Sequence, residues 1–96
     1  MNKTESAYEH HLKLLLMAGE IKSYEFEAIK LRLANKTFYT PDFVVITKDD
    51  LIELHEVKGY WEDDARVKIK VVAKQHWMFK FVAIKKAGNG WSVEEF

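Results

Sequence analysis

The chain has 96 residues with no cysteine, and its 15 acidic and 15 basic side chains give a formal net charge of zero. This length allows a single domain, residues 1–96, with one modest core and no room for a second module. The lack of cysteine excludes a disulfide framework and a thiolate zinc site. No apolar stretch reaches membrane-spanning length and the first residues do not open a signal peptide, so we expect a cytoplasmic protein.

The charges are segregated along the chain although they sum to zero. Eight acidic and two basic residues lie between Asp42 and Asp64, whereas seven basic and no acidic residues lie between Arg66 and Lys86. An acidic region can gather cations and a basic region can bind phosphate groups. This distribution suits a protein that holds a metal ion in one part and a nucleic acid in another.

The first predicted element is a helix over residues 6–18, because apolar residues recur there at helical spacing and Gly19 is placed to end it. Glu9 lies at the flank of the apolar stripe. It has two interpretations: it closes a capping box with Ser6, or it reaches the edge of the core and takes part in a metal site. Glu5, one turn earlier on a similar face, competes for the second role.

Residues 22–33 are predicted to be strand-like, but their apolar side chains change from even to odd positions near Ala28. Because a one-residue slip swaps the faces of a strand, we expect a bulge there or two short strands. A turn at Asn35 and Lys36 then leads into a predicted hairpin. Its strands are residues 38–47 and 51–58, and residues 48–50 form the polar turn.

A candidate metal site lies in this hairpin. Side chains two apart on a strand share a face, so Glu56 and Lys58 follow two apolar residues on the same side. Asp42 interrupts the first strand directly after Pro41, the only proline. Both residues cost stability in a buried strand, so something should compensate. The hairpin can bring Asp42 beside Glu56 and Lys58 as a divalent-metal site. The alternative is an edge-strand aspartate and an exposed ion pair of little energetic consequence.

The second half of the chain predicts a helix over residues 65–77, preceded by three acidic residues that favour a helix N-terminus. The alternating Val67, Ile69 and Val71 also permit a strand, but the length and the charge order favour the helix. Its cationic stripe is a candidate DNA-binding surface or else a solvated face, and consists of Arg66, Lys70 and Lys74.

A strand over residues 79–84, a turn at 87–90 and a short strand at 91–96 complete the chain. The predicted fold is therefore α/β, in the order α-β-β-β-α-β with a small terminal strand. We expect a central mixed sheet flanked by helices.

The order of these motifs resembles the PD-(D/E)XK nuclease superfamily, with Pro41-Asp42, a hairpin, and then Glu56-Val57-Lys58. The superfamily has a restriction-endonuclease-like core of the same α-β-β-β-α-β order. Residues 56–66 resemble the E-x-K-G-x-W-x-x-D-D-R pattern of the endonuclease I type of phage Holliday-junction resolvase, with Ala65 as an insertion-like departure. The chain is also similar to small phage-encoded nucleases. The resemblance covers roughly residues 6–84.

The resemblance implies four catalytic residues, which are Glu9, Asp42, Glu56 and Lys58. The implied metal ligands are Asp42, Glu56, Glu9 and the main-chain carbonyl of Val57. Such oxygen ligands suit Mg²⁺, and we expect Mn²⁺ to substitute for it. Lys58 is expected to orient the attacking water or to stabilise charge on the phosphate.

The expected function is that of a metal-dependent DNA endonuclease, which hydrolyses phosphodiester bonds and acts as a homodimer on branched or Holliday-junction DNA. A phage-encoded protein of this kind would act in the host-cell cytoplasm. One alternative is a related nuclease with a preference for linear, nicked or single-stranded DNA. Another is a catalytically silent copy that only binds DNA. The segment before Tyr39 is shorter than the bridge through which endonuclease I dimers exchange strands, so strand exchange stays open, and RNA is not excluded as a substrate.

Overall fold

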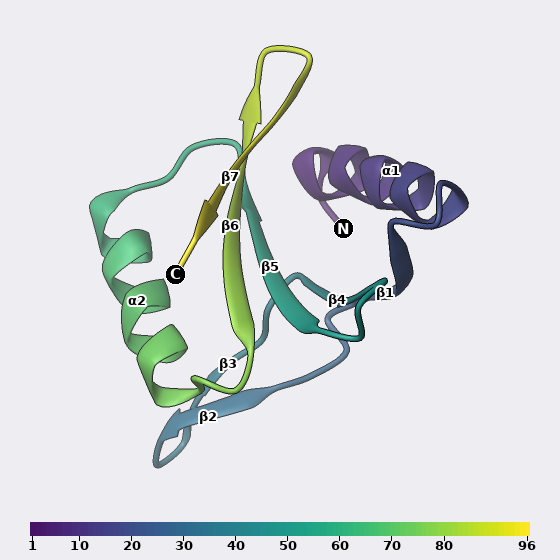
Figure 1. The fold of residues 1–96 in the computed structure, drawn as a ribbon. Helices are drawn as coiled ribbons and strands as arrows, with labels where there is room; N and C mark the ends of the chain where they lie inside the picture. Colours follow the sequence, from purple (N-terminus) through teal and green to yellow (C-terminus); the bar gives the residue numbers. More distant parts are fainter.

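The computed structural model describes residues 1–96 as an α/β fold of two helices, a five-stranded mixed sheet and a separate two-stranded hairpin (Figure 1). Neither helix is long and apolar enough to cross a membrane. In chain order the elements are α1 (Lys3–Met17), β1 (Ile21–Phe26), β2 (Leu31–Ala34), β3 (Thr37–Tyr39), β4 (Phe43–Thr47), β5 (Ile52–Lys58), α2 (Asp63–Gln75), β6 (Lys80–Ala87) and β7 (Gly90–Glu95).

The five-stranded sheet has the order β1-β4-β5-β6-β7. Its only parallel pair is β5 with β6, in which Val57 lies opposite Ile84, and the other neighbours are antiparallel. Helix α2 provides the long crossover that a parallel pair requires. The sheet is therefore mixed, as the sequence predicts.

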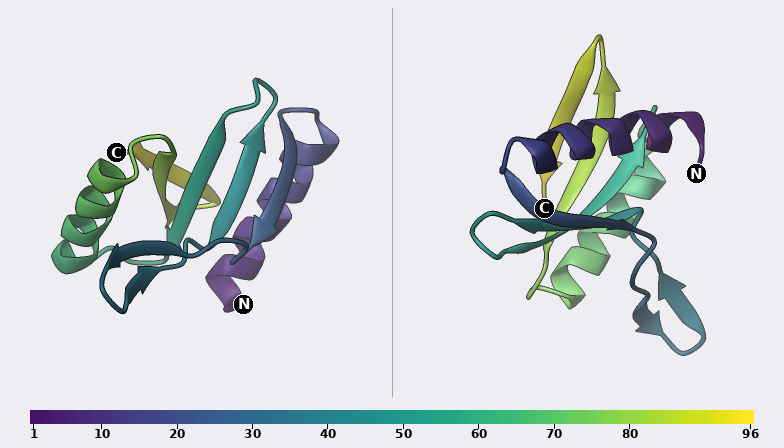
Figure 2. Two further views of the ribbon diagram at one scale, coloured as in Figure 1. Left: turned by 90° about the horizontal axis from the view of Figure 1, so that it is seen from below. Right: turned by 90° about the vertical axis from the view of Figure 1, so that its right-hand side faces the viewer.

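The two helices cover opposite faces of the sheet. In the right-hand view of Figure 2, α1 crosses in front of the sheet and α2 lies behind it. Alternating strand residues divide between the two cores, because successive side chains of a strand point to opposite faces. Tyr8 and Leu12 of α1 pack with Phe43 and Val57, among others, on one face. The core on the α2 face contains Leu54, Ile69, Val72, Phe81 and Ala83.

The β2–β3 hairpin forms its own antiparallel pair, with Leu31 opposite Tyr39. It projects from the body of the molecule at the end of α2 (Figure 2). Leu31, Leu33 and Tyr39 pack against the core on the α2 face. The side chains of Gln75 and His76 also reach the main-chain carbonyls of β2, at 3.4 and 3.0 Å.

The first helix begins three residues earlier than predicted. Asn2 is its N-cap, because its side chain accepts the Glu5 N–H and the Glu5 carboxylate accepts the Asn2 N–H, each at 2.8 Å. The expected capping box between Ser6 and Glu9 is therefore wrong, since both residues lie inside the helix. The predicted end is confirmed: α1 stops before Gly19, whose φ of +77° suits glycine.

The expectation of two short strands in residues 22–33 is confirmed, because β1 and β2 are separate elements. The single strand predicted for residues 38–47 is wrong. It divides into β3 and β4, and the break falls at Thr40, Pro41 and Asp42. Proline has no N–H to donate to a ladder, so the chain passes there from the small hairpin into the main sheet. The observed order thus contains five strands before α2, two more than the three of the predicted order.

The second half follows the prediction with shifted boundaries. Residues 63–75 are helical, which confirms the helix over the alternative strand, although the helix starts and ends two residues earlier than expected. Strand β6 extends to Ala87, so only Gly88 and Asn89 remain for the turn into β7.

Candidate functional site

The candidate site lies where β4 begins and β5 ends. The β4–β5 ladder closes with the pair Phe43 and His55, so Asp42 stands just beyond it. The N-terminal turn of α1 approaches the same end of the sheet, because a methyl group added at Gly59 would lie 3.6 Å from Thr4 Oγ1. Three elements that are distant in sequence therefore meet here.

The Asp42 side chain takes the place of a main-chain acceptor at this end of the β4–β5 ladder. Its Oδ2 accepts a hydrogen bond from the Val57 N–H at 2.8 Å. A buried N–H without a partner is costly, and the Asp42 carboxylate supplies the acceptor that the next residue of β4 would otherwise have provided. Pro41 is itself fully buried. This bond is the compensation that the sequence led us to expect for a proline and a charge beside a core strand.

Glu56 is held from both sides. Its Oε1 accepts a hydrogen bond from the Tyr39 hydroxyl at 2.5 Å, and its Oε2 lies 3.6 Å from Lys58 Nζ. The Glu56 side chain is 13% exposed and that of Lys58 is 45% exposed, so the carboxylate is set in the protein and the ammonium reaches solvent. Asp42, Glu56 and Lys58 are therefore brought to one end of the sheet, as the sequence predicts.

The surroundings of Asp42 disfavour the charged form of its carboxylate. Burial is the main cause that raises its pKa to about 7, and the charge of Glu56 adds to it. The Val57 N–H acts in the opposite direction, because a hydrogen bond to the charged form favours it. Glu5 raises the pKa of Asp42 further, through its charge and a side-chain hydrogen bond. Two or more carboxylates thus share a site with little positive charge, which is the environment that a cation stabilises.

Helix α1 turns Glu5 toward Asp42, and Glu9 lies elsewhere. Glu9 Oε2 accepts from the Tyr24 hydroxyl at 3.4 Å, and its Oε1 lies 4.0 Å from Lys13 Nζ. The sequence had placed Glu9 at the metal site with Glu5 as its competitor. The rotation of α1 is set by Tyr8 and Leu12, which are buried against the sheet, and the capping box at Asn2 holds Glu5 at the start of the helix.

A cleft of about 190 Å³ opens beside Glu56 between the sheet and α2. Tyr39, Lys58 and Lys68 line it together with Trp61. Lys68 Nζ lies 5.9 Å from the centre of the Tyr39 ring, and burial raises the Tyr39 pKa far above its ordinary value, so its hydroxyl stays protonated and able to donate. The sequence assigned no role to Tyr39 or Lys68, because no local pattern shows that they meet beside Glu56.

A larger cavity of about 550 Å³ lies between α1 and the β6–β7 hairpin. Its walls include His11, Leu14, Lys86 and Trp91, and none of the carboxylates described above lines it. This cavity and the carboxylates are therefore in different places.

The side chains alone do not form a complete metal cage, because no group of three or more His, Asp or Glu residues is arranged to hold an ion. Mg²⁺ does not require such a cage. It keeps several waters and is commonly held by one or two carboxylates together with substrate phosphates. Asp42, Glu56 and the Val57 carbonyl therefore fit this ion in number and in kind of ligand.

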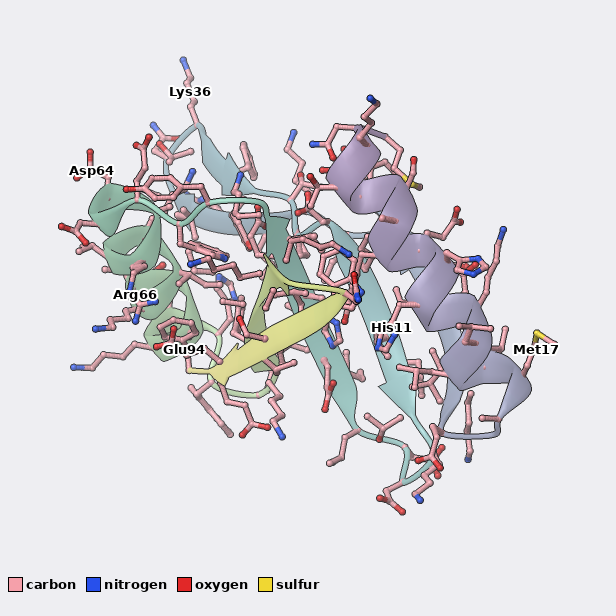
Figure 3. The ribbon with its side chains drawn as sticks, turned by 90° about the horizontal axis from the view of Figure 1, so that it is seen from above. His11, Met17, Lys36, Asp64, Arg66 and Glu94 are labelled. Atoms are coloured by element: carbon pink, nitrogen blue, oxygen red, sulfur yellow. The ribbon has the colours of Figure 1, made fainter.

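One residue of the predicted cationic stripe on α2 already pairs with a carboxylate of the chain. The Arg66 guanidinium donates to both carboxylate oxygens of Glu94 on β7, at 2.5 and 2.6 Å, and the two side chains face each other in Figure 3. Lys70 and Lys74 are exposed. Of the three residues, Arg66 already has a bidentate partner, which the sequence did not indicate because 28 residues separate the two.

A second polar cluster lies on the α1 face of the same strand. His55 is 6% exposed, its Nε2 lies 2.9 Å from Glu53 Oε1, and its Nδ1 lies 2.7 Å from the Tyr8 hydroxyl. An ionised carboxylate only accepts hydrogen bonds, so Nε2 carries a proton, and in the neutral ring Nδ1 accepts from Tyr8. Lys80 lies 3.9 Å from the other Glu53 oxygen. Each polar group of this cluster has a partner.

Neither the models of known protein families nor the curated proteins give a match to this chain.

Proposed function

We propose that this protein is a magnesium-dependent DNA endonuclease with a restriction-endonuclease-like core. The observation that carries the proposal is the meeting of Asp42, Glu56 and Lys58 at one end of the sheet, with the pKa of Asp42 raised to about 7 by burial and by Glu56. A carboxylate whose pKa is strongly perturbed by burial and by a specific charged neighbour is a candidate for function, and that neighbour, Glu56, lines the cleft beside α2. The order of α1, β1, β4, β5, α2 and β6, with β5 and β6 parallel, supports the PD-(D/E)XK assignment.

Each residue has a distinct role in phosphodiester hydrolysis, the reaction in which water adds to phosphorus and one P–O ester bond breaks. Asp42, Glu56 and the Val57 carbonyl would hold the ion. When bound, Mg²⁺ polarises the phosphate and makes a water more acidic. The Lys58 ammonium lies at the mouth of the cleft, where it stabilises the negative charge that develops on the phosphate. Glu5 completes the acidic site from α1, in the role that the sequence assigned to Glu9.

Branched DNA and a homodimer are part of the proposal. Cutting two opposed strands of a junction requires two active sites, and one 96-residue chain supplies one. The exposed lysines of α2, Lys68, Lys70 and Lys74, support contacts to the phosphate backbone, which give affinity without base readout. We place the protein in the cytoplasm, where such substrates are found.

The test is a cleavage assay with Mg²⁺ on a four-way junction, a nicked duplex and a plain duplex, with Lys58→Ala as the matched inactive variant. Lys58 is half exposed, so its truncation leaves the fold intact, which circular dichroism verifies. We expect the wild type to cut the junction best and the variant to cut nothing.

Other outcomes change the proposal in defined ways. Equal cutting of all three substrates that is lost in Lys58→Ala retains the nuclease and removes the junction preference. Cutting by Lys58→Ala at the wild-type rate contradicts the site assignment. If the wild type cuts none of them with Mg²⁺ or Mn²⁺ but binds DNA, the chain is a silent binding copy of the fold.

A further inference from the structure

The β2–β3 hairpin has two chemically different faces. Leu31, Leu33 and Tyr39 point inward and pack against the core on the α2 face. Arg32 lies opposite Phe38 in the pairing, so these two share the other face. Strand alternation thus leaves the hairpin with an apolar inner face and an outer face that nothing in the chain covers.

The outer face combines cations with an exposed aromatic ring. Phe38 is 46% exposed, and Lys30 Nζ lies 4.4 Å from the centre of its ring. Lys36 stands at the tip of the hairpin and extends away from the body of the molecule (Figure 3). No acidic residue occurs between Ala28 and Thr40.

These cations have no carboxylate partner within the chain. Lys30, Arg32 and Lys36 make none of the ion pairs of the structure, in contrast to Arg66, Lys22 and Lys80. An exposed phenyl ring beside unpaired cations matches one ligand chemistry well. Single-stranded nucleic acid stacks its bases on aromatic side chains and offers its phosphates to neighbouring lysine and arginine.

The hairpin is also joined to the candidate site. Tyr39, the last residue of β3, donates its hydroxyl hydrogen bond to Glu56 at 2.5 Å. Only Thr40 and Pro41 separate Tyr39 from Asp42. The hairpin is therefore connected to both carboxylates, to Glu56 through the Tyr39 hydroxyl and to Asp42 through two residues of chain.

We propose that the outer face of the β2–β3 hairpin, formed by Lys30, Arg32, Phe38 and the tip residue Lys36, binds a single-stranded segment of the DNA substrate beside the phosphate that is cut. The inference rests on the proposed nuclease function and adds a substrate feature to it. Phe38 stacks on an unpaired base, and the three cations hold the flanking phosphates. A duplex keeps its bases stacked on one another and offers this surface only its phosphates.

The experiment is a fluorescence-anisotropy titration of a duplex with a single-stranded tail and of the same duplex with blunt ends, both in Ca²⁺ to prevent cleavage. Phe38→Leu removes the ring and keeps an apolar side chain, and Phe38→Trp restores a stacking surface. A double variant, Lys30→Gln with Arg32→Gln, removes two cations. Lys48→Gln is the matched control, because this exposed lysine lies in the β4–β5 turn and pairs with Glu20.

We expect Phe38→Leu to bind the tailed duplex about tenfold more weakly and the blunt duplex about as well as the wild type, since stacking contributes a substantial share of single-strand affinity. Phe38→Trp and Lys48→Gln should bind like the wild type. In the double variant, the slope of log affinity against log salt should fall by about 0.7 for each phosphate that the protein no longer neutralises.

Wild-type affinity of Phe38→Leu for the tailed duplex would overturn the inference, and so would an equal loss on both DNAs. Ultracentrifugation of Phe38→Leu gives a further decisive result, because dissociation of a wild-type dimer would identify the face as a protein interface. Cleavage of the blunt duplex by every hairpin variant, together with its loss in Lys58→Ala, keeps the nuclease function whether or not the hairpin binds DNA.

Discussion

Two carboxylates on neighbouring strands, Glu53 and Asp42, lie in opposite electrostatic surroundings. The hydrogen bond from His55 is the main cause that lowers the pKa of Glu53, and the charges of His55 and Lys80 act in the same direction. Burial and the charge of Glu56 raise the pKa of Asp42 to about 7. Glu53 thus has His55 and Lys80 beside it, whereas Asp42 is half-buried beside Glu56 and makes no ion pair with Lys58, whose Nζ lies 3.6 Å from Glu56.

We propose that the difference separates a structural cluster from a functional one. Buried polar groups that satisfy one another stabilise and specify a core. Like charges that are held together cost stability, and proteins retain them where a ligand or a reaction uses them. We infer that, of these two clusters, the one at the end of β5 is the one that a bound cation would stabilise.

Isosteric neutralisation should produce the largest contrast between the two clusters. Asp42→Asn and Glu56→Gln each remove one negative charge and keep a hydrogen-bond acceptor. We expect cleavage rates to fall by about 100-fold or more, as for other losses of transition-state electrostatics. Glu53→Gln is the matched control and should cut within a few-fold of wild type at a temperature where it is folded. Similar rates for Glu53→Gln and Asp42→Asn would remove the distinction.

Removing one tyrosine hydroxyl from each cluster should produce the next largest contrast between them. Tyr39→Phe removes the donor that orients Glu56, and partners of metal ligands commonly affect metal affinity or activity by about 10-fold or more. We therefore expect Tyr39→Phe to need about 10-fold more Mg²⁺ for half-maximal cleavage. Tyr8→Phe removes the donor to His55 and should leave the Mg²⁺ requirement unchanged while lowering the free energy of unfolding by about 1–3 kcal/mol. An unchanged Mg²⁺ requirement in Tyr39→Phe would exclude its positioning role.

The two helix glutamates allow a finer comparison. Glu5→Gln retains the capping hydrogen bond, because glutamine also serves at this position of a capping box. We expect it to slow cleavage several-fold, on the order of 1 kcal/mol of transition-state stabilisation. Glu9→Gln, next to Tyr24, should cut at the wild-type rate. The reverse ranking in the same assay would restore Glu9 to the metal site.

The smallest expected effects are on the pH dependence of thermal stability, and they have opposite signs for Asp42 and Glu53. Asp42 has a raised pKa in the folded state, so its contribution becomes less favourable as pH rises from about 4 to about 7. Without metal, Asp42→Asn should therefore melt a few degrees above wild type at pH 8 and equally at low pH. Glu53 has a lowered pKa, so its stabilisation is present at neutral pH and disappears as pH falls through the folded-state value. Thermal melts of Glu53→Gln should show a deficit at pH 7 that closes in acid, and the same pH trend in both variants would contradict the contrast.

The sequence predicted those parts of the site that depend on residues close together in the chain. Period-two alternation placed Glu56 and Lys58 on one face, and the hairpin brought Asp42 to them. The break at Pro41 was visible in the sequence as a missing donor. The surrounding aromatic and β-branched residues nevertheless favoured one long strand, because propensity does not reveal that the chain changes sheets there.

Other features depend on tertiary contacts that carry no short-range signal. The rotation of α1 follows from the burial of Tyr8 and Leu12 against the sheet, which brings Glu5 rather than Glu9 near Asp42. The hydroxyl of Tyr39 meets Glu56 across 17 residues, and Arg66 meets Glu94 across 28. Such pairings became evident only from the packing of α2 and the small hairpin.

The most direct test of the central claim is a Mn²⁺ titration of the isotope-labelled protein followed by amide NMR signals, which the paramagnetic ion broadens near its binding site. The account predicts that signals of Val57 and its neighbours broaden first in the wild type and stay sharp in Asp42→Asn, while those around Glu53 change later. Broadening centred on another acidic stretch, such as Asp63 and Asp64, or an identical response in Asp42→Asn, would show that the carboxylates at the end of β5 are not a cation site.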